Sequence, residues 1–198
     1  MKLIRCATTN AGKLREFRLA AAHFGFKNVS IEPIEKLNQL PDCVEDAATF
    51  EENAIKKALH YSVYAHRPVF ADDSGLAVPA LDNAPGVYSA RFAGVGATDE
   101  ANNRLLLERL EGVKNRTAYF VCSIALAHDG RLLGTFNGSV EGRITAEPVG
   151  TEGFGYDPLF FHEPFGCTFG QVSAERKMAV SHRGQALQDM LSYVCGNL

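Results

Sequence analysis

The sequence predicts an α/β fold with a mixed sheet rather than a wholly parallel one. Short apolar strand segments alternate with amphipathic helical segments in the first half of the chain. Further on, the β-prone residues 117–126 lead into Asp129-Gly130, which favours a tight hairpin turn into residues 131–136. Such a hairpin makes the centre of the sheet antiparallel. With 198 residues and 46% hydrophobic content, we expect a single domain, 1–198, with a large core.

Composition excludes several classes of protein. The chain has 20 Lys+Arg against 23 Asp+Glu, a formal net charge of −3, so we expect no sequence-independent binding to nucleic acid. No apolar run approaches the roughly 18 residues of a membrane span, so we expect no membrane partner and a cytoplasmic location. The cysteines lack any Cys-x-x-Cys pair and are odd in number, which argues against a disulfide framework or a zinc knuckle. We expect reduced thiols at Cys6, Cys43, Cys122, Cys167 and Cys195.

The first candidate site is a loop at a helix start. Residues 3–7 are typical of a strand and residues 13–24 of a helix capped by Gly25. The segment between them, Thr8-Thr9-Asn10-Ala11-Gly12-Lys13, places free backbone N–H groups at the positive end of the helix dipole, which suits an anion. It is not a Walker A loop. A plain turn with Thr8, Thr9 or Asn10 as N-cap and a solvated Lys13 fits equally well.

A second helix is predicted by a capping box, Thr49-Phe50-Glu51-Glu52, and is expected to run to about His66. Residues 30–48 before it, including Glu45, are expected to be irregular with one strand at most. The capping box offers Glu52 a role as a cap, as an alternative to a role as a ligand. Lys56 and Lys57 leave this helix about 100° apart, so one can face a cleft while the other faces solvent.

The central candidate is an acidic pair. Val69-Phe70-Ala71 is typical of a short buried strand, and Asp72 and Asp73 follow at its end. If extended geometry continues, the two carboxylates point to opposite faces, so only one can enter a given cleft. Such a pair suits a hard cation such as Mg²⁺. Asp72-Asp73-Ser74-Gly75 is also an ordinary turn, and taken alone the turn is the more common outcome.

The remaining segments are less specific. Residues 79–94 form a loop with aromatic and basic groups, which suits a substrate-facing loop or a surface loop equally. Residues 98–110 are typical of a structural helix. Gly138 and Gly142 are expected to bracket a further strand or bulge.

Two late segments complete the candidate groups. Gly153-Phe154-Gly155-Tyr156-Asp157 has glycines around aromatics, which suits a stacking platform for a flat ligand, although core aromatics at a loop crossing are the simpler explanation. Lys177, His182 and Arg183 lie beside predicted helix starts, where the helix dipole disfavours cations. An anionic or electron-rich ligand would explain them, as would simple solvation. A last helix follows, with Ala186, Leu187, Met190, Leu191 and Val194 inward.

Taken together, these groups resemble the non-canonical purine nucleoside triphosphate pyrophosphatases, also called inosine triphosphate pyrophosphatases. The matching motifs occur in family order from residue 8 to residue 184. They are Thr8-Thr9-Asn10-Ala11-Gly12-Lys13, Thr49-Phe50-Glu51-Glu52-Asn53-Ala54, Ala71-Asp72-Asp73-Ser74-Gly75-Leu76, Ala84-Pro85-Gly86-Val87-Tyr88-Ser89-Ala90-Arg91, Gly153-Phe154-Gly155-Tyr156-Asp157-Pro158 and Ser181-His182-Arg183-Gly184. Two positions depart from the pattern: Thr9 stands where the family often has Gly or Ser, and no glycine follows Glu45-Asp46.

The resemblance implies a long central sheet, two lobes with a nucleotide cleft between them, and a homodimer. It also implies Mg²⁺-dependent cleavage of inosine and xanthosine triphosphates, and their deoxy forms, to the monophosphate and pyrophosphate. By the same resemblance Asp73 is the general base, Lys13 stabilises charge, and Glu45 with Asp73 binds the metal. The implied phosphate ligands are Thr8, Thr9, Asn10, Ala11, Gly12, Lys13, Lys57 and Ser74, and the implied nucleobase site is Phe154, Gly155, Tyr156, Asp157, Lys177, His182 and Arg183.

Two other functions remain open at this point. One is a pyrimidine-directed nucleotide pyrophosphatase with a related cleft, and the other is a nucleotide sensor without catalysis. Hydrogen-bond donors aimed at the six-keto oxygen, from Lys177, Arg183 or backbone N–H groups, would favour hypoxanthine and xanthine over adenine. The sequence leaves open whether Glu45, Asp72 or Glu52 completes the metal site.

Overall fold

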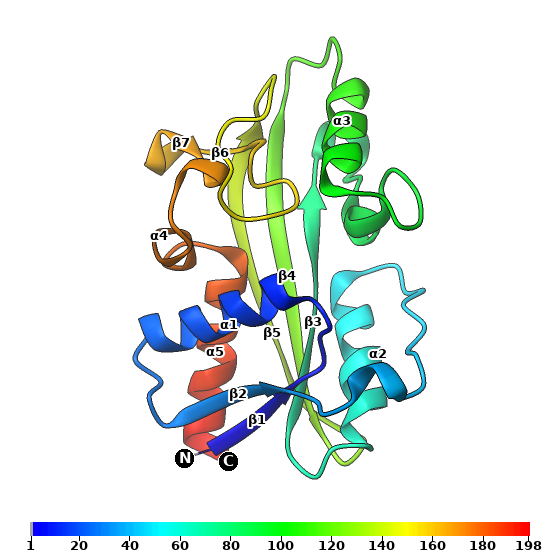
Figure 1. The fold of residues 1–198 in the computed structure, drawn as a ribbon, viewed down its shortest axis with the longest axis vertical. Coiled ribbons are helices and arrows are strands. Elements are labelled where there is room, and N and C mark those ends of the chain that lie inside the picture. Colours follow the sequence, from blue (N-terminus) through cyan, green and yellow to red (C-terminus); the bar gives the residue numbers. More distant parts are fainter. Residues whose placement is uncertain (1) are drawn as a thin grey trace.

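A computed structural model describes residues 2–198 as a seven-stranded sheet in the order β2-β1-β3-β4-β5-β6-β7 (Figure 1). The strands are β1 (Lys2–Cys6), β2 (Val29–Pro33), β3 (Val69–Ala77), β4 (Thr117–His128), β5 (Arg131–Ile144), β6 (Phe160–His162) and β7 (Cys167–Thr168). β1 is parallel to both β2 and β3, and every pairing from β3 to β7 is antiparallel. The predicted mixed sheet with an antiparallel centre is therefore confirmed.

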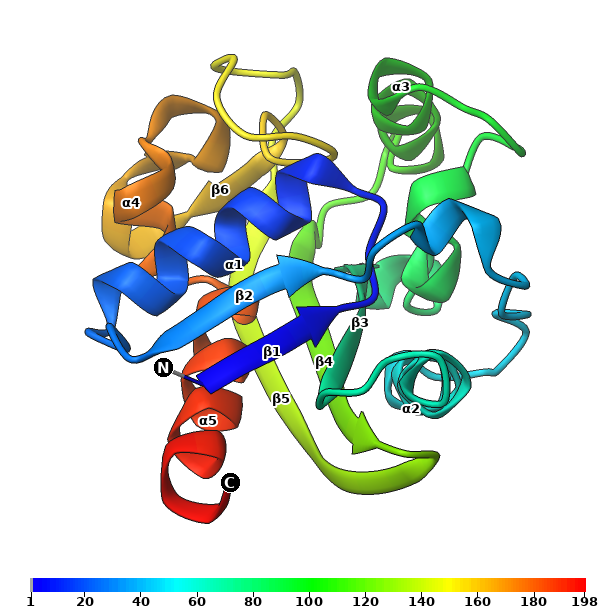
Figure 2. The ribbon, with the colours of Figure 1, turned by 60° about the horizontal axis from the view of Figure 1, so that its bottom comes forward.

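Helices cover both faces of the sheet. They are α1 (Ala11–His23), α2 (Phe50–Ser62), α3 (Asp99–Arg109), α4 (Ala174–Met178) and α5 (His182–Asn197), with short 3₁₀ helices at Leu37–Gln39, Pro79–Leu81, Gly86–Arg91, Glu163–Phe165 and Phe169–Gln171. Figure 2 shows α1 and α5 on one side of the sheet and α2 on the other. Within residues 2–198, none of the helices combines the length and apolar character needed to cross a bilayer.

Two helix boundaries differ from the sequence prediction. α1 begins two residues earlier than expected because Asn10 is its N-cap and accepts a hydrogen bond from the Lys13 N–H at 3.0 Å. α2 ends at Ser62 rather than near residue 66, and the Ser62 hydroxyl accepts a hydrogen bond from the Gly130 N–H of the β4–β5 turn. The predicted capping box is present, with the Glu52 carboxylate accepting from the Thr49 N–H.

The acidic segment is part of one long strand. β3 continues through Ala77, so the prediction of a strand ending at Ala71 and the alternative of a turn at residues 72–75 are both wrong. β4 pairs with β3 along its whole length, including Asp72 opposite Ile124, and these ladder bonds outweigh the local turn preference. β5 likewise runs unbroken to Ile144, through both glycines that were expected to bracket a separate element.

Three apolar clusters divide the molecule into two lobes. Two clusters lie on opposite faces of the sheet in the lobe with β1 and β2, one under α1 and α5 around Phe17, the other under α2 around Ala54. The third, around Phe160, fills the lobe with α3 and β6. β4 contributes to all three, and β4 and β5 run the length of the molecule (Figure 1). The two lobes expected from the resemblance are present.

Candidate active site

A cavity of about 770 Å³ lies between the two lobes. Lys13, from the first helix, Asp73, from β3, and Phe154, from the late glycine-rich loop, all line it. Three segments far apart in the sequence therefore open onto one space. The cavity is large enough for a small organic ligand of nucleotide size.

β3 carries its two acids past the end of β1. β1 pairs with β3 at Arg5 opposite Val69 and Cys6 opposite Phe70, and beyond Phe70 no strand of residues 2–198 lies along this edge of β3. Asp72 and Asp73 point to opposite faces, as extended geometry requires. Both nevertheless line the cavity, so the expectation that only one could enter it is wrong. The open strand edge lets both side chains reach the same space.

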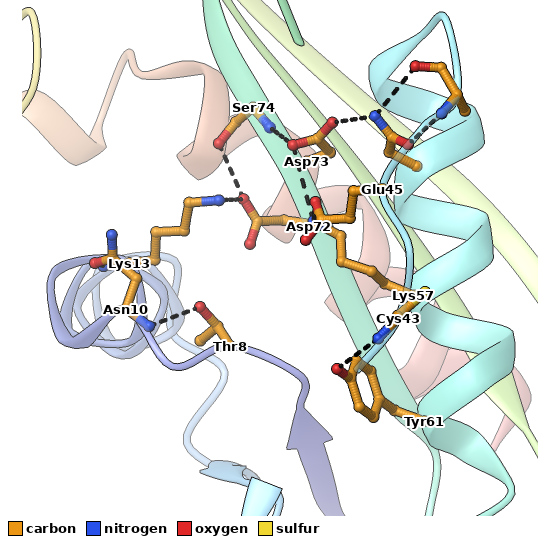
Figure 3. A network of polar contacts seen from close by, with 12 residues as sticks. Thr8, Asn10, Lys13, Cys43, Glu45, Lys57, Tyr61, Asp72, Asp73 and Ser74 are labelled. Carbon is orange, nitrogen blue, oxygen red and sulfur yellow. Dashed lines mark hydrogen bonds and ion pairs between the residues drawn. The ribbon is translucent and has the colours of Figure 1, made fainter. Parts of the chain in front are cut away.

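Asp72 is paired with Lys13. The two charged groups are 2.8 Å apart, and the Ser74 hydroxyl donates to the same carboxylate at 3.0 Å (Figure 3). Burial alone would raise the pKa of Asp72, but the charges of Lys13, Lys57 and Arg183 outweigh it and lower that pKa to about 2. Asp72 is therefore ionised at neutral pH and holds the Lys13 ammonium at the cavity wall.

Asp73 has different surroundings. Its carboxylate accepts hydrogen bonds from the Asn53 side-chain amide at 3.1 Å and from the Ser74 N–H at 3.1 Å. Burial raises the pKa of Asp73 above its ordinary value, and the Lys57 charge and the Asn53 hydrogen bond offset this only in part. The environment therefore separates the proton affinities of two adjacent carboxylates, an arrangement typical of sites where one carboxylate exchanges protons and the other stays charged.

Lys57 lies between Asp73 and Glu45. Its ammonium is 2.7 Å from the Glu45 carboxylate and 3.8 Å from that of Asp73. In Figure 3, Lys57 approaches β3 from α2 while Lys13 approaches from α1 on the other side. Burial would lower the pKa of Lys57, but Asp72, Asp73 and Glu45 together raise it. Lys56 turns away and pairs with Asp46 at the surface, so the expected division between the two lysines is confirmed.

A buried charge network connects the Phe154 loop to Asp72. Lys177 bridges Asp157 at 2.5 Å and Glu16 at 2.8 Å, and Glu16 also pairs with Arg183 at 2.7 Å. The Arg183 guanidinium then donates to the Ser74 hydroxyl, which itself bonds to Asp72. Burial would raise the pKa of Glu16, but Arg183 and Lys177 lower it below its ordinary value. Both ends of the cavity thus share one set of ion pairs.

The Phe154 loop is also held by α3. The Gly155 N–H donates to the Asp99 carboxylate at 2.6 Å, and the Asn103 amide donates to the Gly155 carbonyl at 3.0 Å. The Phe154 ring packs against the backbone of α1 at Gly12. A side chain at this position would crowd the ring, since a Cβ added to Gly12 would lie 3.2 Å from two of its carbons. α3, which the sequence indicated only as a structural helix, therefore fixes part of the cavity wall.

The structure brings most of the sequence-predicted residues to the cavity and leaves four outside its lining. Those that line it are Thr8, Thr9, Asn10, Lys13, Glu45, Lys57, Asp73, Ser74, Phe154, Gly155, Tyr156, Asp157 and Arg183. Ala11 and Gly12 form the first turn of α1 beside it. Lys177 and His182 are 2% and 1% exposed and lie behind the wall. His182 stacks on Phe120, and burial together with the Arg183 and Lys177 charges lowers its pKa well below the ordinary value, so its ring is neutral.

Several residues that shape the cavity had no role in the sequence-based interpretation: Glu16, Asn53, Asp99 and Asn103. The sequence carries no signal that would separate a buried Glu16 from any surface acid on an amphipathic helix. Asn53 belongs to the motif Thr49-Phe50-Glu51-Glu52-Asn53-Ala54 and precedes Lys57 by about one helical turn, a spacing that places the two side chains on one face of the helix. Each residue acts through contacts between elements distant in the chain.

The fold and the cavity define a two-lobed α/β protein whose cleft is built for an anionic ligand. A lysine at a helix start, a second lysine and paired carboxylates are the groups that phosphate chemistry uses. Residues 4–193 match the Ham1 family, and the chain belongs to it.

Individual relatives agree with this assignment. A protein of Geobacter sulfurreducens named dITP/XTP pyrophosphatase is 50% identical over 183 residues, which is 91% of this chain and 90% of the relative. One of an Exiguobacterium species with the same name is 48% identical over 96% of this chain and 95% of its own length. The solved structure of the Staphylococcus aureus Ham1 protein covers 100% of both chains with a TM-score of 0.87 and 38% identity.

Proposed function

We propose that this protein hydrolyses non-canonical purine nucleoside triphosphates, namely ITP, XTP and their deoxy forms, to the monophosphate and pyrophosphate, and so removes them from the nucleotide pool. The observation that carries the proposal is that Lys13, Asp73 and Phe154 line one cavity. The names of the relatives, dITP/XTP pyrophosphatase, support the same reaction and substrate class.

The triphosphate binds at the start of α1. The N–H groups of Asn10 and Lys13 are already bonded to Thr8 and Asn10, so the remaining N–H groups of residues 8–13 and the helix dipole attract the phosphates. Lys13, Lys57 and Ser74 add charge and hydrogen-bond donors. Lys13 and Lys57 are already held in place by Asp72 and Glu45. Positioned cations of this kind stabilise the charge that develops during phosphoryl transfer.

Asp73 is the general base. Burial raises the pKa of Asp73 above its ordinary value, which makes this carboxylate a better proton acceptor for water than an exposed aspartate. The water oxygen then forms a bond to phosphorus at the bridge between the α and β phosphates. The bond between the attacked phosphorus and the bridging oxygen breaks, and the bridging oxygen leaves with the product that contains the other phosphorus.

Glu45 and Asp73 would hold Mg²⁺. Both offer carboxylate oxygens to the cavity, and a positive charge, the Lys57 ammonium, already lies between them. Among residues 2–198, no three His, Cys, Asp or Glu side chains form a metal-binding group, so the protein would supply two ligands, and phosphate and water oxygens the others. The bound ion would neutralise phosphate charge and orient the triphosphate.

The purine ring lies at the Phe154 end of the cavity. The Phe154 ring offers a stacking face, and Arg183, whose guanidinium lies 5.1 Å from the centroid of that ring, offers a donor to a six-keto oxygen. Lys177 lies behind Phe154, 5.3 Å from the centroid of its ring, and would contact the base only after Phe154 moves, while His182 is buried against Phe120. We also propose a homodimer, on the strength of the family resemblance, which sedimentation equilibrium would test.

The decisive experiment measures pyrophosphate release from ITP, XTP, ATP, GTP and pyrimidine triphosphates, with and without Mg²⁺. We expect Mg²⁺-dependent release with a strong preference for ITP and XTP over ATP. Equal rates for ITP and ATP would refute the proposed selectivity. A preference for pyrimidines would indicate the pyrimidine-directed class, and tight binding without release would indicate a sensor.

A further inference from the structure

Asn53 is buried beside the proposed general base and has no role in the reaction proposed above. It lies on α2 about one turn before Lys57 and is 1% exposed. Its side-chain amide donates to the Asp73 carboxylate at 3.1 Å, and its side-chain oxygen accepts from the Ala47 N–H at 3.0 Å. A longer contact of 3.5 Å runs from the same amide to the Ala47 carbonyl. One buried side chain is thus bonded to two different segments.

The two segments carry the two carboxylates assigned above to water activation and metal binding. Asp73 belongs to β3, whose position is fixed by its pairing with β4. Glu45 belongs to the segment before α2, which has no regular secondary structure. Ala47 lies in the same segment, two residues after Glu45. The other contacts of the Glu45 segment run to α2 and to the 3₁₀ helix at Gly86–Arg91: Glu45 pairs with Lys57, Asp46 with Lys56, the Cys43 N–H donates to the Tyr61 hydroxyl, and Arg91 donates to the Glu45 carbonyl. Asn53 hydrogen-bonds both this segment and β3.

We propose that Asn53 is a positioning residue that fixes the separation and orientation of the Glu45 and Asp73 carboxylates. The inference rests on the proposed function, because it assigns a task in that reaction. Asn53 touches neither the water nor the nucleotide in this assignment and acts only through the two acids.

The chemistry of an asparagine fits this task better than that of its neighbours. The position needs a donor toward Asp73 and an acceptor toward the Ala47 N–H, and a primary amide supplies both on a short side chain. An aspartate would place a second carboxylate against Asp73 and offer no donor when ionised. Lys57 also contacts both acids. Its side chain is long and flexible, so it neutralises their charge but does not fix the orientation of the two carboxylates.

The test compares three variants with the wild-type protein. Asn53→Ala removes both contacts, and Asn53→Asp keeps the shape but removes the donor. Ser62→Ala is the matched control, because Ser62 is a buried polar residue on the same helix that joins α2 to the β4–β5 turn, away from the cavity. The measurements are kcat and KM for dITP, thermal unfolding, and the affinity for Mn²⁺ without nucleotide, measured by electron paramagnetic resonance.

We expect Asn53→Ala to lower kcat by about 10- to 100-fold, with KM for dITP changed far less, and to weaken Mn²⁺ binding by a similar factor. Asn53→Asp should lose at least as much kcat. Ser62→Ala should lose stability while keeping kcat and Mn²⁺ affinity. If Asn53→Ala fails to fold, Asn53→Ser replaces it, and the same split between kcat and KM is expected.

Two results would overturn the assignment. One is an unchanged kcat and Mn²⁺ affinity in Asn53→Ala, and the other is an equal fall of kcat in Asn53→Ala and Ser62→Ala, which would indicate a general effect of stability. If the wild-type protein releases no pyrophosphate from any triphosphate, the proposed function fails by itself. The Mn²⁺ comparison still decides whether Asn53 sets the spacing of the two carboxylates.

Discussion

Replacing Lys13 by methionine tests the charge balance around Asp72 directly. The substitution keeps the length of the side chain and removes the ammonium that lies 2.8 Å from the buried Asp72 carboxylate. The pKa of Asp72 falls from its ordinary value of 3.8 to about 2 in the folded protein. Since one pKa unit is worth about 1.4 kcal/mol, this ionised group contributes about 2 to 3 kcal/mol of stability at neutral pH. Lys57 and Arg183 share in that effect, so we expect Lys13→Met to cost about 2 kcal/mol.

Urea unfolding at a series of pH values measures this cost. A carboxyl whose pKa is depressed in the folded state stabilises the protein above its unfolded pKa, and the contribution disappears as pH falls through the folded value. The difference between wild type and Lys13→Met should therefore be full at pH 7 and shrink as pH falls below about 4 toward 2. Lys114→Met, at an exposed lysine, is the control and should change stability by less than about 0.5 kcal/mol.

A double variant separates the charge effect from the loss of packing. Lys13→Met combined with Asp72→Asn has no buried unpaired charge and should recover most of the lost stability. If Lys13→Met is as stable as wild type at pH 7, or if its deficit persists unchanged at pH 3, the electrostatic account of Asp72 is wrong.

Three further predictions concern other parts of the site. Asp73→Asn should retain nucleotide binding and lower kcat by at least about a hundredfold, and the acid limb of kcat/KM in the wild type should lie above pH 3.8 because burial raises the pKa of Asp73; near-normal turnover would reject the assignment. Gly75→Ala should lower the free energy of unfolding by about 1 to 3 kcal/mol, since a Cβ would lie 2.7 Å from the Gly86 carbonyl and closer still to Ser89 Oγ; an unchanged melting temperature would contradict this. Asp99→Ala should raise KM for dITP about fivefold with little change in kcat, because the Gly155 N–H loses its partner; isothermal titration with a monophosphate product would check it.

The convergence of Lys13, Asp73 and Phe154 was predictable from the sequence, because their motifs follow one another in an order typical of a known family, and the cavity confirms it. The local structure around Asp72 and Asp73 was less predictable. Asp-Asp-Ser-Gly has the composition of a turn, and only the pairing with β4, about 50 residues away in the chain, keeps it extended. Non-local pairing of this kind leaves no trace in a short window of sequence.

Burial of charged side chains was the other property that the sequence did not reveal. Lys177 and Arg183 have the pattern of solvated cations beside helix starts, yet both are buried because Glu16, on a helix more than 150 residues earlier, neutralises them. Asn53 was equally inconspicuous, since a helical asparagine appears the same in sequence whether it faces water or two backbone segments. The tertiary packing of helices decides such cases, and periodicity alone does not.

The sharing of β4 among all three apolar clusters has a consequence for how the molecule unfolds and moves. Ala118 and Phe120 belong to one cluster, Ile124 to a second and Ala125 to the third, all within one unbroken strand. Neither lobe can melt without withdrawing this strand from the other, so we expect calorimetry to show a single cooperative transition despite the two-lobed shape. β3 spans the three clusters as well, with Phe70 in one, Ala71 in another and Leu76 in the third, so we expect any relative motion of the lobes to require bending of both shared strands.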